Sequence, residues 1–208
     1  MNVLMVLAAF VEPALGADGS DGSDKPDADV DRIARFRAGD PTAFGDIYRA
    51  HVDAVYRRLS RILGPVAERD DLAQDVFVAL HRALPTFRGD STLGTFIHRV
   101  AINKALGYLR TRGRKPATPS DTKFFDRMIA PQTSPEARAA QREQLALVFA
   151  CLAKIKPKKR IALLLRVVDG LSFEAIGKLV DTTPDAVAKR VQHGQRELDA
   201  LLARTEVR

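Results

Sequence analysis

The sequence predicts an all-α fold made of two small helical domains joined by a flexible linker. From residue 31 onward the apolar residues recur at helical spacing, and no run alternates as a strand would. Helix start and stop signals bracket these periodic runs. A proline-containing stretch without a sustained period separates the helices into two groups. We therefore expect domains at 31–112 and 139–204, with the linker at 113–138.

Composition and charge narrow the function classes. The 208 residues are 46% hydrophobic and carry 33 Lys and Arg against 26 Asp and Glu, a net charge of +7. Residues 1–30 hold six acidic residues and one lysine, so the rest of the chain is basic, at +12. This balance favours a polyanionic partner such as nucleic acid. The glycines and prolines show no period, which excludes collagen-like and repeat folds.

Residues that hold metals or form disulfides are scarce. The one cysteine, Cys151, can form neither an internal disulfide nor a Cys-rich zinc cluster, and its apolar helical surroundings indicate a core position. The four histidines lie far apart and form no ligand pair. We expect no metal and no other cofactor.

The first thirty residues do not fit the domain pattern. An apolar run extends from Val3 to Val11. A signal peptide requires Lys or Arg before such a run, and this sequence has neither there. The run is also too short to span a membrane. Gly, Ser and Asp dominate the residues that follow. We expect 1–30 to be a disordered N-terminal extension, or the product of an upstream start codon.

Three helices are expected in the first domain. Asp40 and Pro41 supply an N-cap and a first-turn proline for a helix that ends at Gly64-Pro65. A second helix is periodic from Leu72 to Leu84 and ends at Pro85. After a polar loop, Ser91 or Thr92 caps the third, which is periodic from Leu93 to Leu109.

Four helices are expected in the second domain. Ser134-Pro135 caps the first, the next runs from Pro157 to Gly170, Ser172 caps a short third, and the last begins at Thr183-Pro184. The linker before them contains a small apolar cluster that we expect to dock onto one of the domains or onto a partner: Phe124, Phe125, Met128 and Ile129.

The last two helices form a helix-turn-helix pattern. Three residues, 181–183, separate them, and Gly177 permits a close approach of the second helix. The face opposite the apolar stripe of that helix carries groups suited to phosphates and base edges: Asp185, Lys189, Gln192, His193 and Arg196. The alternative is an ordinary solvated face. A basic run just before this motif fits a solvated helix start better than a backbone-contacting patch: Lys154, Lys156, Lys158, Lys159 and Arg160.

The second helix of the first domain presents an acidic end, with Asp70, Asp71 and Asp75 beside Gln74. Paired carboxylates suit general acid and base catalysis, but the sequence offers no nucleophile, metal ligands or glycine-rich phosphate loop. We therefore expect no enzyme activity and no small-molecule substrate. An acidic and apolar face in a basic domain is better explained as a protein-docking surface.

The third helix presents a basic strip beside aromatic residues, a combination suited to single-stranded DNA. Its polar members are His98, Arg99, Asn103, Lys104, Arg110 and Arg112, and the nearby aromatics are Phe87, Phe96 and Tyr108. For Phe96 a core position is favoured.

Three segments together resemble a known family: "FGDIYRAHVDAVYRRLSRILG", "DDLAQDVFVALHRALPTFRGDSTLGTFIHRVAINKALGYLRTRGR" and "LLLRVVDGLSFEAIGKLVDTTPDAVAKRVQHGQREL". They are similar to regions two and four of the extracytoplasmic-function (ECF) group of bacterial RNA polymerase sigma factors, within the sigma-70 family. The resemblance covers about 31–112 and 139–203, in the family's order.

The resemblance implies a role for each region. Region two would bind the clamp helices of the polymerase beta-prime subunit through the helix that carries Asp70, Asp71, Gln74, Asp75, Phe77 and Leu80. It would melt and read the minus-ten promoter element with Phe87, Arg88, Asp90, Ser91, Arg99, Asn103, Lys104 and Arg110. Region four would dock on the beta flap and read the minus-thirty-five element with Thr183, Asp185, Lys189, Arg190, Gln192, His193 and Arg196.

The family also implies partners and a location. Its members bind core RNA polymerase and promoter DNA, are usually held inactive by an anti-sigma factor, and act in the cytoplasm, at times held at the inner membrane by that factor. This sequence departs from the family's usual pattern at Phe96, Ala188, Gly194 and the turn "VDTT". The rival interpretations are a stand-alone helix-turn-helix regulator, which would bind promoter DNA without polymerase, and, less favoured, a helical hydrolase or exported protein.

Overall fold

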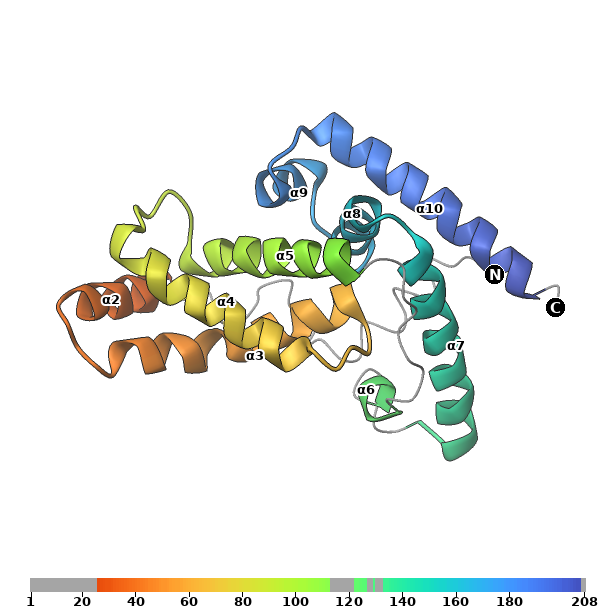
Figure 1. Cartoon of the computed structure of the whole chain (residues 1–208), viewed down its shortest axis with the longest axis horizontal. Coiled ribbons are helices and arrows are strands. Elements are labelled where there is room, and N and C mark those ends of the chain that lie inside the picture. Colours follow the sequence, from red (N-terminus) through yellow and green to blue (C-terminus); the bar gives the residue numbers. More distant parts are fainter. Residues whose placement is uncertain (1–25, 113–121, 127–128, 130–132, 207–208) are drawn as a thin grey trace. The chain divides into compact units, whose positions relative to one another are not determined.

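The computed structural model describes residues 26–112, 122–126, 129 and 133–206 (Figure 1). Across these ranges the regular structure is helical and no strand occurs, which confirms the all-α fold class. The chain divides into two compact units: residues 26–63 and 67–108 fall in the first, and the helices after residue 121 fall in the second. Each unit has its own buried apolar core. Among the described residues, no helix is long and apolar enough to cross a membrane.

The described part of the first unit contains α2 (Pro26–Arg37), α3 (Ala43–Leu63), α4 (Arg69–Ala83), the 3-10 helix η1 (Leu84–Thr86) and α5 (Leu93–Arg112). Helix α3 packs against both α2 and α4. The apolar periodicity of the sequence becomes the core, whose members include Ile47, Leu59, Val76, Leu80 and Ile97.

The predicted start of this domain at residue 31 is wrong, because α2 begins five residues earlier, at Pro26. Asp29 is only 3% exposed and accepts hydrogen bonds from His51 Nε2 of α3, at 3.1 and 3.2 Å, and from Arg32 Nη1 at 2.7 Å. The acidic segment that the sequence predicts to be a disordered extension therefore contains a buried carboxylate, Asp29, that belongs to the folded unit. Residues 1–25 of the predicted extension lie outside the described residues.

The predicted helix boundaries are correct to within a few residues. Asp40 does not cap α3 directly: its Oδ1 accepts from the amide of Thr42 at 2.8 Å, and the helix begins at Ala43. Gly64 ends α3 with a φ of +75°. Of the two candidate caps for α5, Thr92 is the one used, since its Oγ1 accepts from the Thr95 amide at 3.2 Å.

The second unit contains α6 (Thr122–Asp126), α7 (Pro135–Lys154), α8 (Pro157–Val167), α9 (Phe173–Val180) and α10 (Pro184–Glu206). Helix α10 packs along α8 and also contacts α7 and α9. Val187, Val191 and Leu198 of its predicted stripe are buried, but the next buried residue is Leu202 rather than Leu201. Cys151 is buried in α7, as expected of a core position.

Helix α6 and the start of α7 lie within the predicted linker at 113–138. Ser134 Oγ accepts from the Ala137 amide at 3.3 Å, so α7 begins inside the predicted linker at Pro135. The apolar cluster docks onto the second unit through Phe124, Phe125 and Ile129, all buried. Met128 and the stretch 113–121 lie outside the described residues.

Candidate nucleic-acid and protein interfaces

The helix-turn-helix in the second unit is fixed by side-chain caps on both helices. Ser172 Oγ accepts from the Ala175 amide at 3.1 Å at the start of α9, and Thr183 Oγ1 accepts from the Ala186 amide at 3.3 Å at the start of α10. Between them, Asp181 adopts a left-handed φ of 51° that ends α9. These contacts set the angle at which α10 leaves the turn.

Two glycines permit close backbone approach within this motif. A Cβ on Gly177 would lie 2.7 Å from the carbonyl oxygen of Thr182 in the turn and 3.6 Å from the nitrogen of Pro184, the first residue of α10, so this glycine makes room mainly for the turn and also for the start of the second helix. The helix-to-helix approach depends on Gly194 of α10, where a Cβ would lie 3.2 Å from the carbonyl oxygen of Lys159 in α8.

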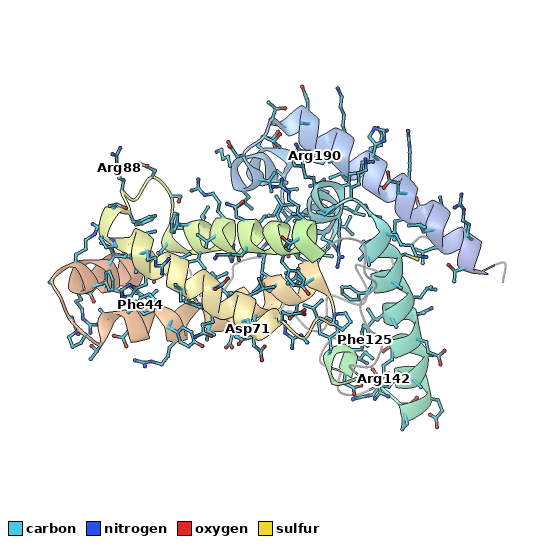
Figure 2. The ribbon with its side chains drawn as sticks, in the orientation of Figure 1. Phe44, Asp71, Arg88, Phe125, Arg142 and Arg190 are labelled. Atoms are coloured by element: carbon cyan, nitrogen blue, oxygen red, sulfur yellow. The ribbon has the colours of Figure 1, made fainter. Side chains whose placement is uncertain are left out.

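The outer face of α10 presents most of the predicted DNA-reading side chains to solvent. The exposed residues are Thr183, Asp185, Lys189, Gln192, His193 and Arg196. Arg190 is different, because it is half-buried and its Nη2 donates to Thr182 Oγ1 at 3.2 Å (Figure 2). Arg190 therefore braces the turn, and the exposed cations of this face are Lys189 and Arg196.

The basic run at the start of α8 is not a uniformly solvated surface. Lys154, Lys156 and Lys158 are exposed, whereas Arg160 is only 4% exposed and its Nε has no hydrogen-bond partner among the residues that the structure describes. Burial lowers the pKa of Arg160 to about 10. Sequence reasoning missed this burial, because a charged residue is ordinarily assigned to the surface.

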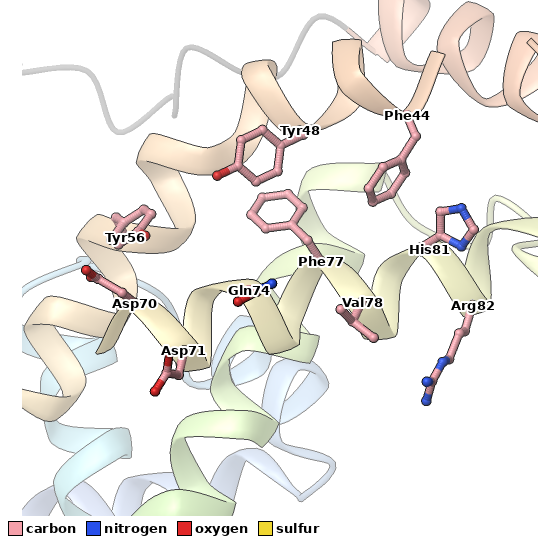
Figure 3. A pocket seen from close by; sticks show the side chains of 10 residues that line it. All are labelled: Phe44, Tyr48, Tyr56, Asp70, Asp71, Gln74, Phe77, Val78, His81 and Arg82. Carbon is pink, nitrogen blue, oxygen red and sulfur yellow. The ribbon is translucent and has the colours of Figure 1, made fainter. Parts of the chain in front are cut away.

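In the first unit, α3 and α4 border a groove of about 590 Å³ (Figure 3). Asp70, Asp71 and Gln74 line one end of the groove, and all three are exposed. Asp75 points elsewhere: its Oδ2 lies 3.4 Å from Lys104 Nζ of α5. The four polar residues predicted as one docking face are thus divided between the groove and the contact with α5.

Two residues predicted to bind a partner are core residues of this unit. Leu80 is 0% exposed and cannot touch another protein, so its assignment is wrong. Phe77 is 4% exposed and forms part of the groove wall, with its ring centroid 4.6 Å from that of Tyr48. Its contribution is mainly to the packing of α4 on α3.

Sequence reasoning missed the wall of the groove that α3 supplies. Tyr48 is 41% exposed there, and Val78 of α4, opposite, is 43% exposed. Phe44 stacks edge-on with His81 at 4.8 Å. Burial and the negative charge of Asp70 raise the pKa of Tyr56. The sequence signal for this wall was the spacing of Phe44, Tyr48 and Tyr56, four and eight residues apart along α3. The same spacing is also explained by packing in a buried core.

The loop before α5 carries the predicted single-strand contacts. Arg88 and Asp90 are exposed at its tip, and Ser91 and Phe87 are half-buried. Arg37 of α2, which sequence reasoning did not single out, donates from Nη2 to the carbonyl oxygen of Phe87. This hydrogen bond anchors one end of the loop to the body of the unit.

Helix α5 continues this surface with charged and amide side chains. Asn103 and Arg110 are exposed, whereas Arg99 and Lys104 are half-buried. Phe96 is half-buried rather than a core residue, and it lies between Phe87, at a centroid distance of 5.2 Å, and the Arg99 guanidinium, 5.9 Å from its ring. An aromatic pair beside a cation is the arrangement on which unstacked bases can lie.

Comparisons with known proteins match both units to one family. The family model "Sigma-70 region 2" matches residues 47–115, and the model "Sigma-70, region 4" matches residues 145–198. The RNA polymerase sigma-H factor of Pseudomonas aeruginosa is 31% identical over 180 residues, which cover 84% of this chain and 93% of that protein. The ECF RNA polymerase sigma-E factor of Escherichia coli K12 is 29% identical over 174 residues, covering 80% and 90%.

A solved structure has the same fold. The structure of CnrH in complex with the cytosolic domain of CnrY aligns with a TM-score of 0.56 and 24% identity, over 85% of this chain and 97% of that one. The two family matches occur in the order of the two units, and the relatives are similar over nearly their whole length. The chain therefore belongs to the ECF group of sigma-70 family RNA polymerase sigma factors, which bind core polymerase and direct promoter-specific initiation of transcription.

Proposed function

We propose that this sigma factor divides its work among three surfaces. The groove between α3 and α4 docks on the beta-prime clamp helices of core polymerase, the loop before α5 together with α5 melts and reads the minus-ten element, and α10 reads the minus-thirty-five element. The observation that carries this assignment is the placement of the exposed charged side chains: Asp70 and Asp71 lie at one end of the groove, Lys189 and Arg196 on the outer face of α10, and Arg88 at the tip of the loop.

The groove suits a helical protein partner. Tyr48 and Val78 offer exposed apolar contacts, and Asp70 and Asp71 add negative charge at one end. Asp70 and Asp71 lie in the first turn of α4, where negative charge interacts favourably with the helix dipole. They therefore do not destabilise the helix when no partner is bound. We expect the partner helices to present apolar side chains flanked by Lys or Arg.

The α10 surface suits the major groove of duplex DNA. The first turn is capped and its amides can approach a phosphate, while Lys189, Gln192 and Arg196 extend from the outer face. Arg190 is left out of this base-reading set because it braces the turn. The same unit is proposed to dock on the beta flap, as the family resemblance implies.

The loop before α5 suits the opened minus-ten strand. Arg88 is exposed and can bind a phosphate of the strand. The rings of Phe87 and Phe96 lie side by side and can stack against a base that has left the duplex. Anchoring by Arg37 holds one end of this loop in place before DNA arrives.

An inhibitory protein partner and a cytoplasmic location belong to the same proposal. CnrH, the structural neighbour, was solved in complex with the cytosolic domain of CnrY, a protein partner. By analogy we propose that an anti-sigma factor covers polymerase-binding surfaces of this chain. The chain itself would carry out no catalysis, because the polymerase makes the RNA.

Charge reversal tests the groove. Asp71→Arg should weaken binding to core polymerase about tenfold or more, because it places like charge against the expected Lys or Arg of the partner. Asp53→Arg is the matched control, since Asp53 is an exposed acid of α3 outside the groove lining. Equal affinity of both variants for core polymerase, measured by fluorescence anisotropy, would contradict the docking assignment.

A further inference from the structure

Two side chains of the α5 strip predicted to contact single-stranded DNA are held by acidic residues in or next to α4. Lys104 Nζ of α5 lies 3.4 Å from Asp75 Oδ2 of α4. Four residues further along α5, the hydroxyl of Tyr108 donates to Oε2 of Glu68, the residue before α4, at 2.9 Å. Residues four apart share one face of a helix, so the same face of α5 meets a carboxylate at both places.

The carboxylate of Asp75 opposes the binding of DNA at Lys104. It offsets the ammonium charge that would attract a phosphate, and it places a negative charge close to the position that the phosphate would take. A DNA strand therefore pairs fully with Lys104 only after the contact with Asp75 is broken. In the free chain this contact acts against the function proposed for α5.

Asp75 also has a second partner available to it. The family resemblance places Asp75 in the polymerase-binding set, and 59% of its side chain is exposed. A Lys or Arg of the polymerase can therefore reach this carboxylate from outside the unit. Because that cation and the ammonium of Lys104 repel each other, pairing of Asp75 with one weakens its pairing with the other.

We propose that Asp75 masks Lys104 in the free chain and that polymerase docking releases this lysine for the phosphates of the minus-ten strand; this rests on the function proposed above. A basic side chain of the polymerase that binds Asp75 neutralises the carboxylate and repels the Lys104 ammonium. Polymerase docking therefore raises the affinity of α5 for DNA. By linkage, DNA bound at Lys104 raises the affinity for polymerase by the same factor.

Solvent exposure limits the size of this effect. The side chains of Lys104 and Asp75 are 37% and 59% exposed, so water and salt screen the pair. Exposed ion pairs change an equilibrium constant by about fivefold at most. Release of Lys104 should therefore adjust DNA binding by a factor of about two to five, and should not switch it on and off.

Affinity for core polymerase, measured without DNA by fluorescence anisotropy, gives the most direct test. Lys104→Gln leaves Asp75 free for the polymerase, so this variant should bind core polymerase about two- to fivefold more tightly than the parent at low salt. Arg49→Gln is the matched control, because it removes one positive charge from an exposed side chain of α3 outside the groove lining. Equal affinities of these two variants for core polymerase would overturn the proposal.

Binding of a short labelled oligo(dT) to the free chain tests the masking itself. Contacts to phosphate carry no base information, so oligo(dT) serves in place of a promoter strand. Asp75→Asn should raise the affinity for oligo(dT) about two- to fivefold. Asp53→Asn, which changes an exposed acid of α3 outside the groove lining, should raise it less.

The same measurement in a Lys104→Gln background separates the contact from net charge. Without the lysine, Asp75→Asn should have no larger effect on oligo(dT) binding than Asp53→Asn has. An equal gain from Asp75→Asn with and without Lys104 would show that only net charge acts, and it would refute the masking.

Oligo(dT) binding by the assembled holoenzyme tests release by the polymerase. At saturating core polymerase, the parent and Asp75→Asn should bind oligo(dT) with the same affinity, because the polymerase already pairs with Asp75. A gain from Asp75→Asn as large as in the free chain would refute the release. If Lys104→Gln does not weaken oligo(dT) binding by the holoenzyme, the proposed DNA contact of α5 fails. The affinities for core polymerase measured without DNA would still decide whether Lys104 and the polymerase compete for Asp75.

Discussion

Gly177 in α9 offers the sharpest test of how the helix-turn-helix is built. In Gly177→Ala the new Cβ would lie 2.7 Å from the carbonyl oxygen of Thr182 and 3.6 Å from the amide nitrogen of Pro184. Both are backbone atoms, so no side chain can rotate away. The turn must move by several tenths of an ångström, and α10 must move with it.

The expected size of the effect follows from two opposing contributions. Replacing Gly by Ala inside a helix stabilises it by about 1 kcal/mol, and forcing atoms into a packed site costs about 1–3 kcal/mol. The difference between the two contributions is about 0–2 kcal/mol, and because the 2.7 Å contact is with backbone we expect Gly177→Ala to destabilise the second unit by up to about 2 kcal/mol. Gly194→Ala, with its closest contact at 3.2 Å, should be near neutral. Gly107→Ala in α5 should stabilise its unit, because among the described residues nothing beyond the helix's own backbone and the chain neighbours lies within 4 Å of the new Cβ.

Urea unfolding followed by circular dichroism measures these differences, and Gly177→Ala and Gly194→Ala report on the same unit. Transcription provides the functional readout. Gly177→Ala should reduce initiation that depends on the minus-thirty-five element while leaving affinity for core polymerase unchanged. If Gly177→Ala proves as stable as Gly194→Ala and reads the upstream element normally, the close approach at the turn is not what requires glycine.

Other predictions concern the start of the first unit and the two DNA contacts. Removal of residues 1–30 should destabilise the first unit by about 1–3 kcal/mol in urea relative to removal of 1–25, because it leaves the buried His51 without Asp29; equal stability would contradict this. Burial raises the pKa of Asp29, but its bonds with His51 and Arg32 outweigh burial and lower that pKa below 3.8. This stabilisation is present at neutral pH and should be lost as the pH falls through the folded-state pKa, and Asp29→Asn should flatten the acid limb of the unfolding curve. Lys189→Ala should cost about 1–3 kcal/mol in upstream-element binding if the side chain reaches a base, or weaken all sequences alike and lower the salt slope by about one if it contacts phosphate. Asn103→Ala should instead impair opening, a defect that a pre-melted template relieves in permanganate footprinting; no relief would point away from melting.

The order of helices and their caps could be predicted from the sequence, because both are local. Ser134, Ser172 and Thr183 each bond to an amide three residues ahead, so a short window contains the whole signal. The family resemblance likewise depends on residues contiguous in the chain. The exposed cations of α10 follow from its apolar stripe, since a helix that buries one face must expose the other.

The tertiary structure decided which polar residues stay at the surface. Asp29, Arg160 and Arg190 are charged residues of the kind that usually lies in solvent. In the structure Asp29 is paired with His51 inside the first unit, Arg160 is buried in α8, and Arg190 braces the turn before α10. The groove could not be predicted either, because its two walls come from α3 and α4, and the same aromatic spacing serves equally well for a buried core.

Periodicity and capping are properties of neighbouring residues, and the sequence by itself determined the all-α class, the two domains, the helix-turn-helix and the family. Only the tertiary structure decided that the linker phenylalanines dock on Phe149, that Leu80 is core, and that the groove has two walls. Each of these depends on which helices face one another. That pairing is set by the packing of surfaces far apart in the chain, and the period of a single helix does not encode it.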